Sequence, residues 1–359
     1  MMTPRYHSLR IAEVRPETPD CISVKFDVPP ELESEYRFVQ GQHIGLRTTL
    51  DGEELRRSYS ICSGVDDGEI RVAIKKVGGG KFSRWANDAL QPGDSIDVMT
   101  PEGRFFTALD ATRGKHYAAF VSGSGITPVL SLIRTTLARE PRSRFTLVYG
   151  NRRQSSVMFH EALEDLKDRY LTRFRLYNVF SREEQEVELF NGRIDAAKVG
   201  EFLESLVPPD TIDEAFVCGP MSMIDEVEVA LIAAGVPAQH VHVERFGIPD
   251  GSALKEDNTE AEFLATESHI ELIIDGVRRE VDFMPGQHSI LDAGRAAGID
   301  LPFSCKGGMC STCRAKVLEG QVKMAKNYAL EPHEVAEDFV LTCQSYPLTE
   351  RVVLSYDAR

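Results

Sequence analysis

The sequence predicts a multi-domain protein with an antiparallel β-barrel, then an α/β domain with a parallel sheet, then a C-terminal α+β domain. Up to about residue 110, short alternating or apolar runs are broken by turn residues, as in a barrel of short strands. From about residue 115, apolar strands, glycine turns and amphipathic helices alternate, which indicates a parallel sheet covered by helices. The chain ends with a hairpin signal and a cysteine-rich loop. We expect domains over 1–110, 111–248 and 267–359, joined by a linker over 249–266.

Length, charge and cysteine use limit the class of protein. A chain of 359 residues exceeds one ordinary core, so we expect roughly two or three domains. The net charge of -15 argues against nucleic acids and anionic membranes as partners, since both would repel the chain. No apolar run approaches the ~18 residues of a membrane span, and residues 1–20 lack the features of a signal peptide. We therefore expect a cytoplasmic protein in which Cys21, Cys62 and Cys218 are reduced thiols.

The expected elements follow from hydrophobic periodicity and turn residues. In the first domain, strands are expected at 22–26, 43–47, 70–74 and 95–99, and a helix at 82–90. In the second, strands are expected at 117–121, 145–149, 174–180, 215–217 and 241–243, with helices at 128–139, 156–169 and 221–234. Residues 249–266 are polar and without a period, which is typical of a tether. In the third domain, a hairpin is expected over 269–283 around Asp275-Gly276, and a helix at 289–297.

Four cysteines in the last domain have the spacing of a redox cluster. Three of them lie so close together that neither a helix nor a strand could aim all three at one point. Gly307 and Gly308 permit the backbone to curl around a shared centre. The pattern C-x4-C-x2-C with a distant fourth cysteine is the plant-type spacing for a 2Fe-2S cluster, whereas zinc sites usually carry two close ligand pairs. The expected ligands are Cys305, Cys310, Cys313 and Cys343, with zinc as the alternative metal.

The residues between these cysteines are mostly small, which favours the same cluster. Backbone amides of Gly308, Met309, Ser311 and Thr312 would be able to point N–H groups at the sulfur atoms. Such donors stabilise the reduced state of an iron-sulfur centre. We therefore expect a redox centre in this loop.

The stretch Arg57-Ser58-Tyr59-Ser60 brings a cation, an aromatic ring and two hydroxyls to the end of an expected strand. Because side chains alternate along a strand, Arg57 and Tyr59 should point to one side and the two serines to the other. A flavin would use this set, since the guanidinium pairs with a phosphate and the tyrosine ring packs on the isoalloxazine. The alternative is a surface arginine beside a core tyrosine.

A glycine run that leads into a helix start supports the flavin interpretation. Free amide groups and the positive end of a helix dipole would face a ligand in front of that helix, which suits a pyrophosphate. Lys75 and Val77 lie between this run and the Arg57 motif. The residues expected at the phosphates are Gly79, Gly80, Lys81, Phe82 and Ser83.

A second nucleotide-binding turn is predicted where the α/β domain begins. The stretch Gly123-Ser124-Gly125-Ile126-Thr127-Pro128 follows a strand and opens a helix, which is the setting of a dinucleotide-binding turn. Pro128 stands where the usual fingerprint has glycine, but proline is tolerated in a first helical turn. A tight strand-to-helix turn without a ligand is the alternative.

Arginines at two expected strand ends bear on the choice of nicotinamide nucleotide. NAD-selective sites usually carry an acid at the end of the second strand, but here Asn151 is followed by Arg152 and Arg153. Ser181 and Arg182 end the next strand. Arginines at both tips would pair with a 2′-phosphate, so we expect NADPH as the substrate. Solvated surface arginines are the alternative.

Together these motifs resemble the ferredoxin-NADP reductase superfamily, fused to a C-terminal plant-type ferredoxin. The Arg57 motif and the glycine run are similar to its two flavin motifs, which implies FAD as the flavin, with FMN as the less expected alternative. The run from Lys306 to Cys313 and the Leu-Thr-Cys motif at Cys343 resemble plant-type ferredoxins, which implies a β-grasp fold for the last domain. The resemblance also implies that Thr127 lies close to the nicotinamide.

The same superfamily implies roles for several more residues. Its Cys-Gly-Pro motif matches Cys218-Gly219-Pro220 and would place the thiol near the nicotinamide, whereas a buried small cysteine is the alternative. Its members place an acid and an aromatic ring, here Glu244 and Phe246, against the flavin and the nicotinamide. Hydride transfer needs no general base, so no histidine is expected to be catalytic. The candidate catalytic residues are Tyr59, Ser60, Thr127, Cys218, Glu244 and Phe246.

The order of the parts suggests an electron chain within one polypeptide. Hydride carries two electrons and an iron-sulfur centre accepts one, so a flavin must lie between them. Glu53–Cys62, Tyr149–Arg152, His242–Phe246 and Leu301–Cys313 resemble the family of reductase subunits of phenylacetyl-CoA epoxidase complexes. This resemblance implies a di-iron oxygenase as the electron acceptor, in aerobic phenylacetate degradation. The alternatives are a reductase of the same layout for another oxygenase, hydroxylase or desaturase, and a zinc-binding interaction protein.

Overall fold

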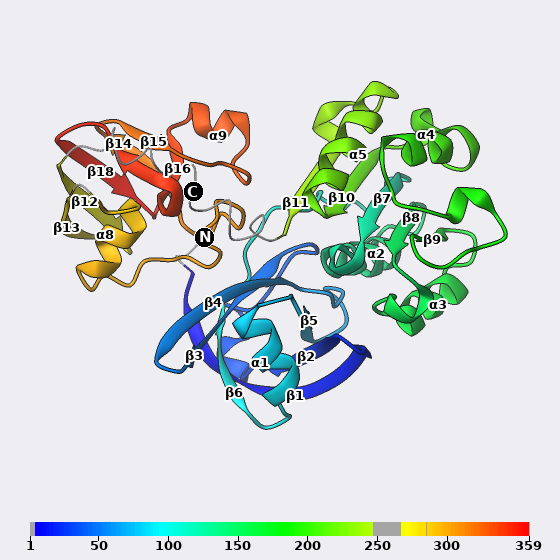
Figure 1. Cartoon of the computed structure of the whole chain (residues 1–359), viewed down its shortest axis with the longest axis horizontal. Helices are drawn as coiled ribbons and strands as arrows, with labels where there is room; N and C mark the ends of the chain where they lie inside the picture. Colours follow the sequence, from blue (N-terminus) through cyan, green and yellow to red (C-terminus); the bar gives the residue numbers. More distant parts are fainter. Residues whose placement is uncertain (1–3, 247–266, 285, 359) are drawn as a thin grey trace. The chain divides into compact units, whose positions relative to one another are not determined.

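The computed structural model describes residues 4–246, 267–284 and 286–358, and the expected linker at 249–266 lies outside them. The chain divides into two compact units. One unit contains residues 1–7, 49–58 and 247–359, and the other contains residues 8–48 and 59–246. Figure 1 shows the sheets and helices of each part.

The first sheet forms the predicted antiparallel barrel. In spatial order its six strands are β4 (Glu53–Ser60), β3 (His43–Leu50), β6 (Ser95–Met99), β1 (Tyr6–Thr18), β2 (Cys21–Asp27) and β5 (Ile70–Lys75). Just beyond β4, Ile61 forms an antiparallel bridge with Val72 of β5, and the Cys62 amide donates to the Arg71 carbonyl at 2.8 Å. This bridge joins the two ends of the sheet. The helix α1 (Lys81–Ala89) packs against β5 and buries Phe82 and Ala86.

The second sheet is parallel, as the alternation of strands and helices predicts. Its order is β11 (Val241–Arg245), β10 (Glu214–Gly219), β7 (His116–Ser122), β8 (Arg144–Asn151) and β9 (Phe174–Phe180). Helices α2 (Ile126–Arg139) and α3 (His160–Arg169) share a core with Tyr117, Ala119 and Val121. Helices α4 (Ala196–Ser205) and α5 (Met221–Ala233) share a core with Ala118 and Phe120. Because neighbouring strand residues point to opposite faces, helices cover both faces of the sheet (Figure 1).

Two helices of this sheet differ from the sequence-based expectation. The helix expected from residue 156 begins only at His160, because Phe159 has a φ of 57°, which is incompatible with a continuing helix. The helix α4 was not expected. Its start is marked by Asp195, whose side chain accepts a hydrogen bond from the Lys198 amide at 2.9 Å.

The C-terminal sheet mixes parallel and antiparallel pairs. Its order is β13 (Val277–Phe283), β12 (Ser268–Ile274), β18 (Arg351–Ser355), β14 (Arg314–Glu319) and β16 (Phe339–Leu341). The predicted hairpin pairs β12 with β13, and both turn residues, Asp275 and Gly276, have positive φ. Ser289 caps the predicted helix α8 (Ile290–Ala296). A short pair, β15 (Val322–Met324) and β17 (Ser345–Pro347), and the helix α9 (Pro332–Ala336) complete this part.

The barrel and the parallel sheet share one hydrophobic core. Cys62 and Phe105 from the barrel part are buried in the same cluster as Tyr117 of β7 and Leu132 of α2. The rings of Phe105 and Phe216 meet edge to face, with centroids 5.2 Å apart. This shared core keeps the end of the flavin-motif strand and the nucleotide turn within one compact unit. No helix in the described part of the chain is long and apolar enough to span a membrane.

Candidate cofactor sites

The Arg57 motif lies at the end of β4, as expected. Arg57 is exposed, and its guanidinium donates to the Arg56 carbonyl at 2.7 Å. Within its own unit, the Ser58 hydroxyl donates to the hydroxyl of Ser304 at 2.8 Å. Tyr59 is half-buried, and its ring centroid lies 5.8 Å from that of Phe82 in α1. An exposed cation and a half-buried ring fit the phosphate and the isoalloxazine of a flavin.

The glycine run forms a tight loop in front of α1. Gly79 has a φ of 73°, and the Gly80 amide donates to the Val77 carbonyl at 3.0 Å. Ser83 turns back and accepts a hydrogen bond from the Val77 amide at 3.1 Å. The helix start has no side-chain cap, so its first amides can serve a phosphate.

Several residues expected beside the flavin have structural contacts instead of an open position. Phe82 is fully buried, and the Ser83 hydroxyl is engaged by the loop itself. The Lys75 ammonium lies 3.7 Å from the Asp20 carboxylate. Val77 is 64% exposed, so the loop backbone is accessible around it. The loop can therefore bind a pyrophosphate through its backbone groups more than through these side chains.

The predicted nucleotide turn lies directly against β10. Gly123–Gly125 form a 3-10 turn between β7 and α2, and Gly123 has a φ of 55°. A Cβ atom on Gly125 would lie only 2.2 Å from the carbonyl oxygen of Cys218, so no other residue fits there. The sequence marks both glycines, but only the structure shows that the second one is required by a strand far away in the chain.

Hydrogen bonds hold the threonine and the first glycine of this turn. The Thr127 hydroxyl donates to the Ser124 carbonyl at 2.9 Å, and Thr127 is buried. The Tyr149 hydroxyl, from β8, donates to the Gly123 carbonyl at 3.0 Å. Ile126 and Pro128 are buried in the first turn of α2. Tyr149 was not expected at this site, because in the sequence it is only the last residue of an expected strand.

Cys218, Glu244 and Ser60 come together from three different strands. Cys218 and Glu244 are partners in the parallel pair of β10 and β11. The Ser60 hydroxyl, at the end of β4, donates to Glu244 Oε2 at 3.3 Å. Burial raises the pKa of Glu244 to about 8, and burial followed by the nearby Glu244 raises the pKa of the Cys218 thiol above its ordinary value. The carboxyl can therefore exchange a proton near neutral pH, whereas the thiol stays protonated.

The remaining residue expected at this end of β11 is Phe246. It directly follows the strand and is 37% exposed, so its ring is accessible. Gly219 is half-buried at the end of β10, and Pro220 is the residue before α5. These positions place the Cys-Gly-Pro motif and Phe246 at the carboxyl ends of adjacent strands, where open α/β sheets bind ligands.

His242 of β11 and His240, in the turn before this strand, share a structural partner at the opposite end of the sheet. Glu214 at the start of β10 is buried, and its carboxylate lies 2.9 Å from His242 Nε2 and 3.2 Å from His240 Nδ1. Lys115 donates to the same carboxylate at 2.6 Å. Burial acts to raise the pKa of Glu214, but these three partners outweigh it and hold the pKa at about 2. The two histidines therefore have a structural role, because their contacts with Glu214 link β10 to β11 and to the turn before it.

The two strand-end arginines lie next to each other. The Arg182 amide donates to the Arg152 carbonyl at 2.9 Å, and the Ser181 amide donates to the Asn151 carbonyl at 3.0 Å. Arg152, Ser181 and Arg182 are exposed at the carboxyl ends of β8 and β9. Two exposed arginines whose backbones are adjacent fit the binding of a phosphate dianion.

The cysteine loop turns its amides toward sulfur. The Gly307 and Met309 amides donate to Cys305 Sγ at 3.3 and 3.5 Å, and the Cys305 amide donates to Cys310 Sγ at 3.5 Å. Met309 was among the expected donors, but Gly307 donates in place of Gly308. Gly308 instead supplies the turn: it has a φ of 76°, and a Cβ there would lie 3.1 Å from the Lys326 carbonyl.

The loop is held in an unusual backbone conformation. Lys306 and Ser311 also have positive φ, at 53° and 52°, which is uncommon outside glycine and costs energy. The four cysteines form two hydrogen-bonded pairs, Cys305 with Cys310 and Cys313 with Cys343. The hydrogen bond from Cys310, together with the two amides, lowers the pKa of Cys305. A thiolate stabilised by amides is the form that binds iron, so the loop fits a 2Fe-2S cluster.

Three residues that were not among the predicted site residues support this loop. The Thr342 hydroxyl donates to the Cys313 carbonyl at 3.0 Å and accepts from the Tyr356 hydroxyl at 2.8 Å. The Gln344 side chain donates to the Lys306 carbonyl at 2.8 Å. Thr342 and Gln344 flank Cys343, so a search around the fourth cysteine would have found them. Tyr356 follows β18 and would have been missed. Partners of this kind orient the ligands of a metal centre.

Three protein families match consecutive parts of the chain. The family described as "Oxidoreductase FAD-binding domain" matches residues 8–107. The "Oxidoreductase NAD-binding domain" matches residues 121–228. The "2Fe-2S iron-sulfur cluster binding domain" matches residues 272–348. The chain is therefore an NAD(P)H oxidoreductase with FAD and a 2Fe-2S cluster as cofactors, and the zinc alternative is wrong.

Similar proteins extend the match to the whole chain. One subunit of the 1,2-phenylacetyl-CoA epoxidase of Escherichia coli (strain K12) is 46% identical over 354 residues, which are 99% of this chain and 98% of that protein. The ferredoxin reductase component of the Mycobacterium tuberculosis 3-ketosteroid-9-alpha-monooxygenase is 35% identical, over 97% of this chain and 95% of that protein. The structure of phthalate dioxygenase reductase has the same fold, with a TM-score of 0.59 at 24% identity and 98% of each chain covered. The chain thus belongs to the family of FAD- and 2Fe-2S-containing reductase components of oxygenases, together with its E. coli phenylacetyl-CoA epoxidase relative.

Proposed function

We propose that this protein takes electrons from NADPH and delivers them to the di-iron oxygenase of a phenylacetyl-CoA epoxidase complex, in aerobic phenylacetate catabolism. The observation that carries the proposal is the 46% identity to the E. coli epoxidase protein over almost the full length of both chains. When bound, FAD takes two electrons from the reduced nicotinamide and releases them singly to the 2Fe-2S cluster. The oxygenase then needs only to dock where the cluster delivers its electrons.

The residues that we propose for these steps follow from their positions. Arg57 and the amides before α1 bind the FAD phosphates, and Tyr59 packs on the ring system. Thr127 and Cys218 line the nicotinamide position, Glu244 holds a proton that Ser60 orients, and Phe246 shields the site. Cys305, Cys310, Cys313 and Cys343 hold the cluster.

NADPH as the preferred nucleotide rests on charge. Arg152 and Arg182 are adjacent and exposed at the strand ends, where the ribose of a bound dinucleotide lies in proteins of this architecture. A 2′-phosphate would satisfy both guanidinium groups, and NADH has no such group. A reduced nicotinamide pool is also the reason to propose a cytoplasmic location. The domain limits that we propose are those expected from the sequence, 1–110, 111–248 and 267–359.

Reconstitution of the complete reaction tests which oxygenase accepts the electrons. The purified holoprotein is combined with NADPH, phenylacetyl-CoA and the oxygenase subunits of a phenylacetyl-CoA epoxidase, and consumption of the thioester is followed together with NADPH oxidation. Coupled consumption of both is expected. The matched control replaces the oxygenase and phenylacetyl-CoA by a 3-ketosteroid 9α-monooxygenase and a 3-ketosteroid, because a reductase component of that system is also similar to this chain. Coupled turnover with the steroid oxygenase and none with the epoxidase would assign the protein to the second system.

A further inference from the structure

The chain segment between β4 and β5 follows the flavin-motif strand and contacts α2, the helix that begins with the predicted nucleotide turn. It begins at Ile61, directly after Ser60, and ends at Glu69, directly before β5. Its outer part, Gly64–Asp67, lies against the C-terminal half of α2, and α2 begins with the nucleotide turn at its other end. We define residues 61–69 as the connector. It belongs to the same compact unit as α2.

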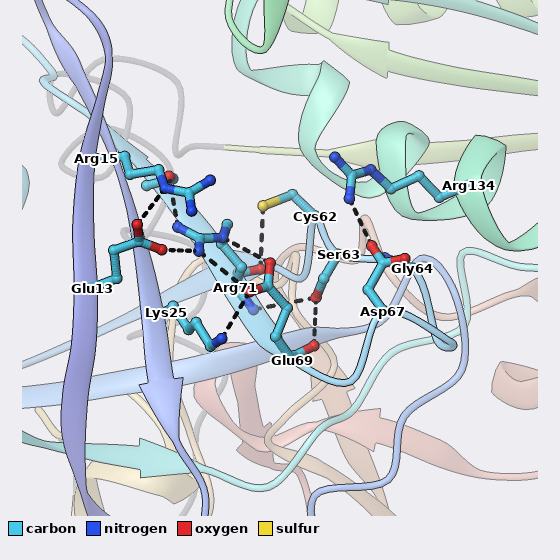
Figure 2. A network of polar contacts seen from close by, with 11 residues as sticks. Glu13, Arg15, Lys25, Cys62, Ser63, Gly64, Asp67, Glu69, Arg71 and Arg134 are labelled. Carbon is cyan, nitrogen blue, oxygen red and sulfur yellow. Dashed lines mark hydrogen bonds and ion pairs between the residues drawn. The ribbon is translucent and has the colours of Figure 1, made fainter. Parts of the chain in front are cut away.

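The root of the connector is fixed in the barrel by a buried arginine (Figure 2). Arg71 is only 6% exposed, and its guanidinium is paired with the carboxylates of Glu13 and Glu69. Burial acts to lower the pKa of Arg71, but the two carboxylates outweigh it and raise the pKa. The Arg71 carbonyl accepts a hydrogen bond from the Cys62 amide at 2.8 Å, and the Arg71 amide donates to the Ser63 hydroxyl at 3.2 Å. The connector root is therefore immobilised on both its backbone and its side chains.

The tip of the connector is a compact turn. The Gly64 amide donates to the Asp67 carboxylate at 2.8 Å, and the Asp67 amide donates to the Gly64 carbonyl at 3.1 Å. The same carboxylate oxygen of Asp67 accepts from Arg134 of α2 at 2.6 Å, which Figure 2 shows. One side chain thus both shapes the turn and attaches it to the helix.

Two more contacts attach the tip to α2. Asp66 receives two hydrogen bonds from Arg139, at 2.8 and 2.7 Å, in a bidentate pair. The hydrogen bonds from Arg139 lower the pKa of Asp66. The Val65 amide donates to the hydroxyl of the buried Thr135 at 3.1 Å. Contacts at residues 134, 135 and 139 hold the last turns of the helix.

From this geometry we propose that Asp66, Asp67, Arg134 and Arg139 are positioning residues for hydride transfer. A helix is a rigid rod, so contacts at the C-terminal half of α2 set where its N-terminal turn, with Thr127, lies relative to the end of β4, with Tyr59 and Ser60. Hydride transfer moves two electrons and one proton from the reduced nicotinamide to the flavin and depends steeply on their distance. The proposal rests on the flavin and nicotinamide sites assigned above.

The Asp66–Arg139 pair offers a charge swap that leaves the turn intact. Within the part of the chain that the structure describes, the Asp66 side chain bonds to Arg139 alone, whereas Asp67 also holds the Gly64 amide. The variants are Asp66→Arg, Arg139→Asp and the two together. An exposed pair within α3, Lys167 with Glu164 at 3.4 Å, gives the matched control, as Glu164→Arg, Lys167→Asp and both.

Anaerobic single turnovers of the holoprotein with NADPH measure the rate of flavin bleaching and, from its concentration dependence, the nucleotide dissociation constant. Each single variant of the 66–139 pair is expected to slow bleaching by about tenfold, with the dissociation constant nearly unchanged, because the nucleotide moves together with α2. The swap is expected to restore the rate. Hydrogen exchange of the connector amides should rise in the single variants and fall again in the swap.

Three results would overturn the proposal: unchanged bleaching in both single variants, a change confined to the dissociation constant, or slow bleaching that the swap does not restore. Equal slowing by the α3 control pair would also contradict it, since that pair does not touch the connector. A failure of the unaltered protein to bleach with either NADPH or NADH would be a different result, because it would remove the proposed nicotinamide and flavin sites themselves.

Discussion

At the scale of single residues, the site depends on atoms that approach each other from distant parts of the chain. Gly125 has ordinary helical backbone angles, so its glycine is explained by space and not by conformation. The carbonyl oxygen of Cys218 occupies the position that a side chain would take. Glu244 is similar, because burial raises its pKa and the hydrogen bond from the distant Ser60 offsets only part of that rise.

Replacing Gly125 by alanine should push the nucleotide turn away from β10. Overpacking of this kind costs about 1–3 kcal/mol, and we expect a loss of that size in the free energy of unfolding, with a higher KM for NADPH. Urea unfolding and steady-state kinetics measure both. Gly200→Ala in α4 is the control, because no atom lies within 4 Å of the added Cβ and alanine favours a helix by about 1 kcal/mol. Equal stability of the two variants would contradict the steric explanation.

The raised pKa of Glu244 predicts a specific pH dependence of stability. Between the ordinary value of 4.5 and the folded-state pKa of about 8, the folded protein keeps a proton that the unfolded chain has lost. The free energy of unfolding of the natural protein should therefore fall with rising pH in this window, relative to Glu244→Gln, and run parallel to it above about pH 8. Unfolding curves across the window measure this difference, with the exposed Glu201→Gln as the control. Parallel curves throughout would show that Glu244 titrates normally.

At the scale of secondary structure, the carboxyl ends of the parallel strands carry the residues that we propose for the nucleotide site, and the amino ends carry structural contacts. The Cys218 and Glu244 partners lie toward the carboxyl ends of β10 and β11, whereas Glu214 and the two histidines join the strands at their amino ends. The same direction of β8 and β9 makes Arg152 and Arg182 neighbours. Strand direction therefore decides which polar residues lie at the end of the sheet where open α/β sheets bind ligands.

Removal of both strand-end arginines should lower the preference for NADPH. In Arg152→Ala/Arg182→Ala we expect the KM for NADPH to rise about tenfold or more and the KM for NADH to change little, because only NADPH has a 2′-phosphate. Steady-state kinetics with a dye acceptor and both nucleotides give the comparison. Arg175→Ala, an exposed arginine near the amino end of β9, is the control. Equal effects on both nucleotides would remove the 2′-phosphate assignment.

At the scale of the whole molecule, three consecutive parts provide one site each. The families for FAD, NAD and the 2Fe-2S cluster follow each other along the chain without overlap. Two electrons enter as a pair and leave singly, so each part has a separate task. A change in the last part should therefore spare the chemistry of the first two.

Substitution of one cluster cysteine tests this division. Cys310→Ser should lose the visible and electron paramagnetic resonance signals of the cluster and abolish electron delivery to the oxygenase, because a ligand is missing. NADPH-dependent reduction of a two-electron dye should continue at a rate within about twofold of the natural protein, since a dye can take electrons at the flavin. Cys21→Ala, a buried cysteine of β2 outside the loop, should keep the cluster signals. Loss of dye reduction in Cys310→Ser would show that the parts are not independent.

The sequence by itself determined the order of the parts and the strands and helices with clear periods, and it predicted candidate residues for each cofactor motif. Residue spacing alone was enough to predict the cysteine loop and the two glycine turns, because these signals lie within a few neighbouring residues. It did not reveal α4 or most strands of the C-terminal sheet, since the strands that pair with β14, β16 and β18 lie elsewhere in the chain.

Only the tertiary structure decided which residues meet across those distances. The carbonyl of Cys218 beneath Gly125, the Ser60–Glu244 hydrogen bond and the attachment of the connector to α2 all join segments that no local pattern relates. Periodicity specifies which face of a strand or helix is buried, but not which partner covers it. Those partners set the pKa of Glu244 and the position of the nucleotide turn, and through them the chemistry of the site.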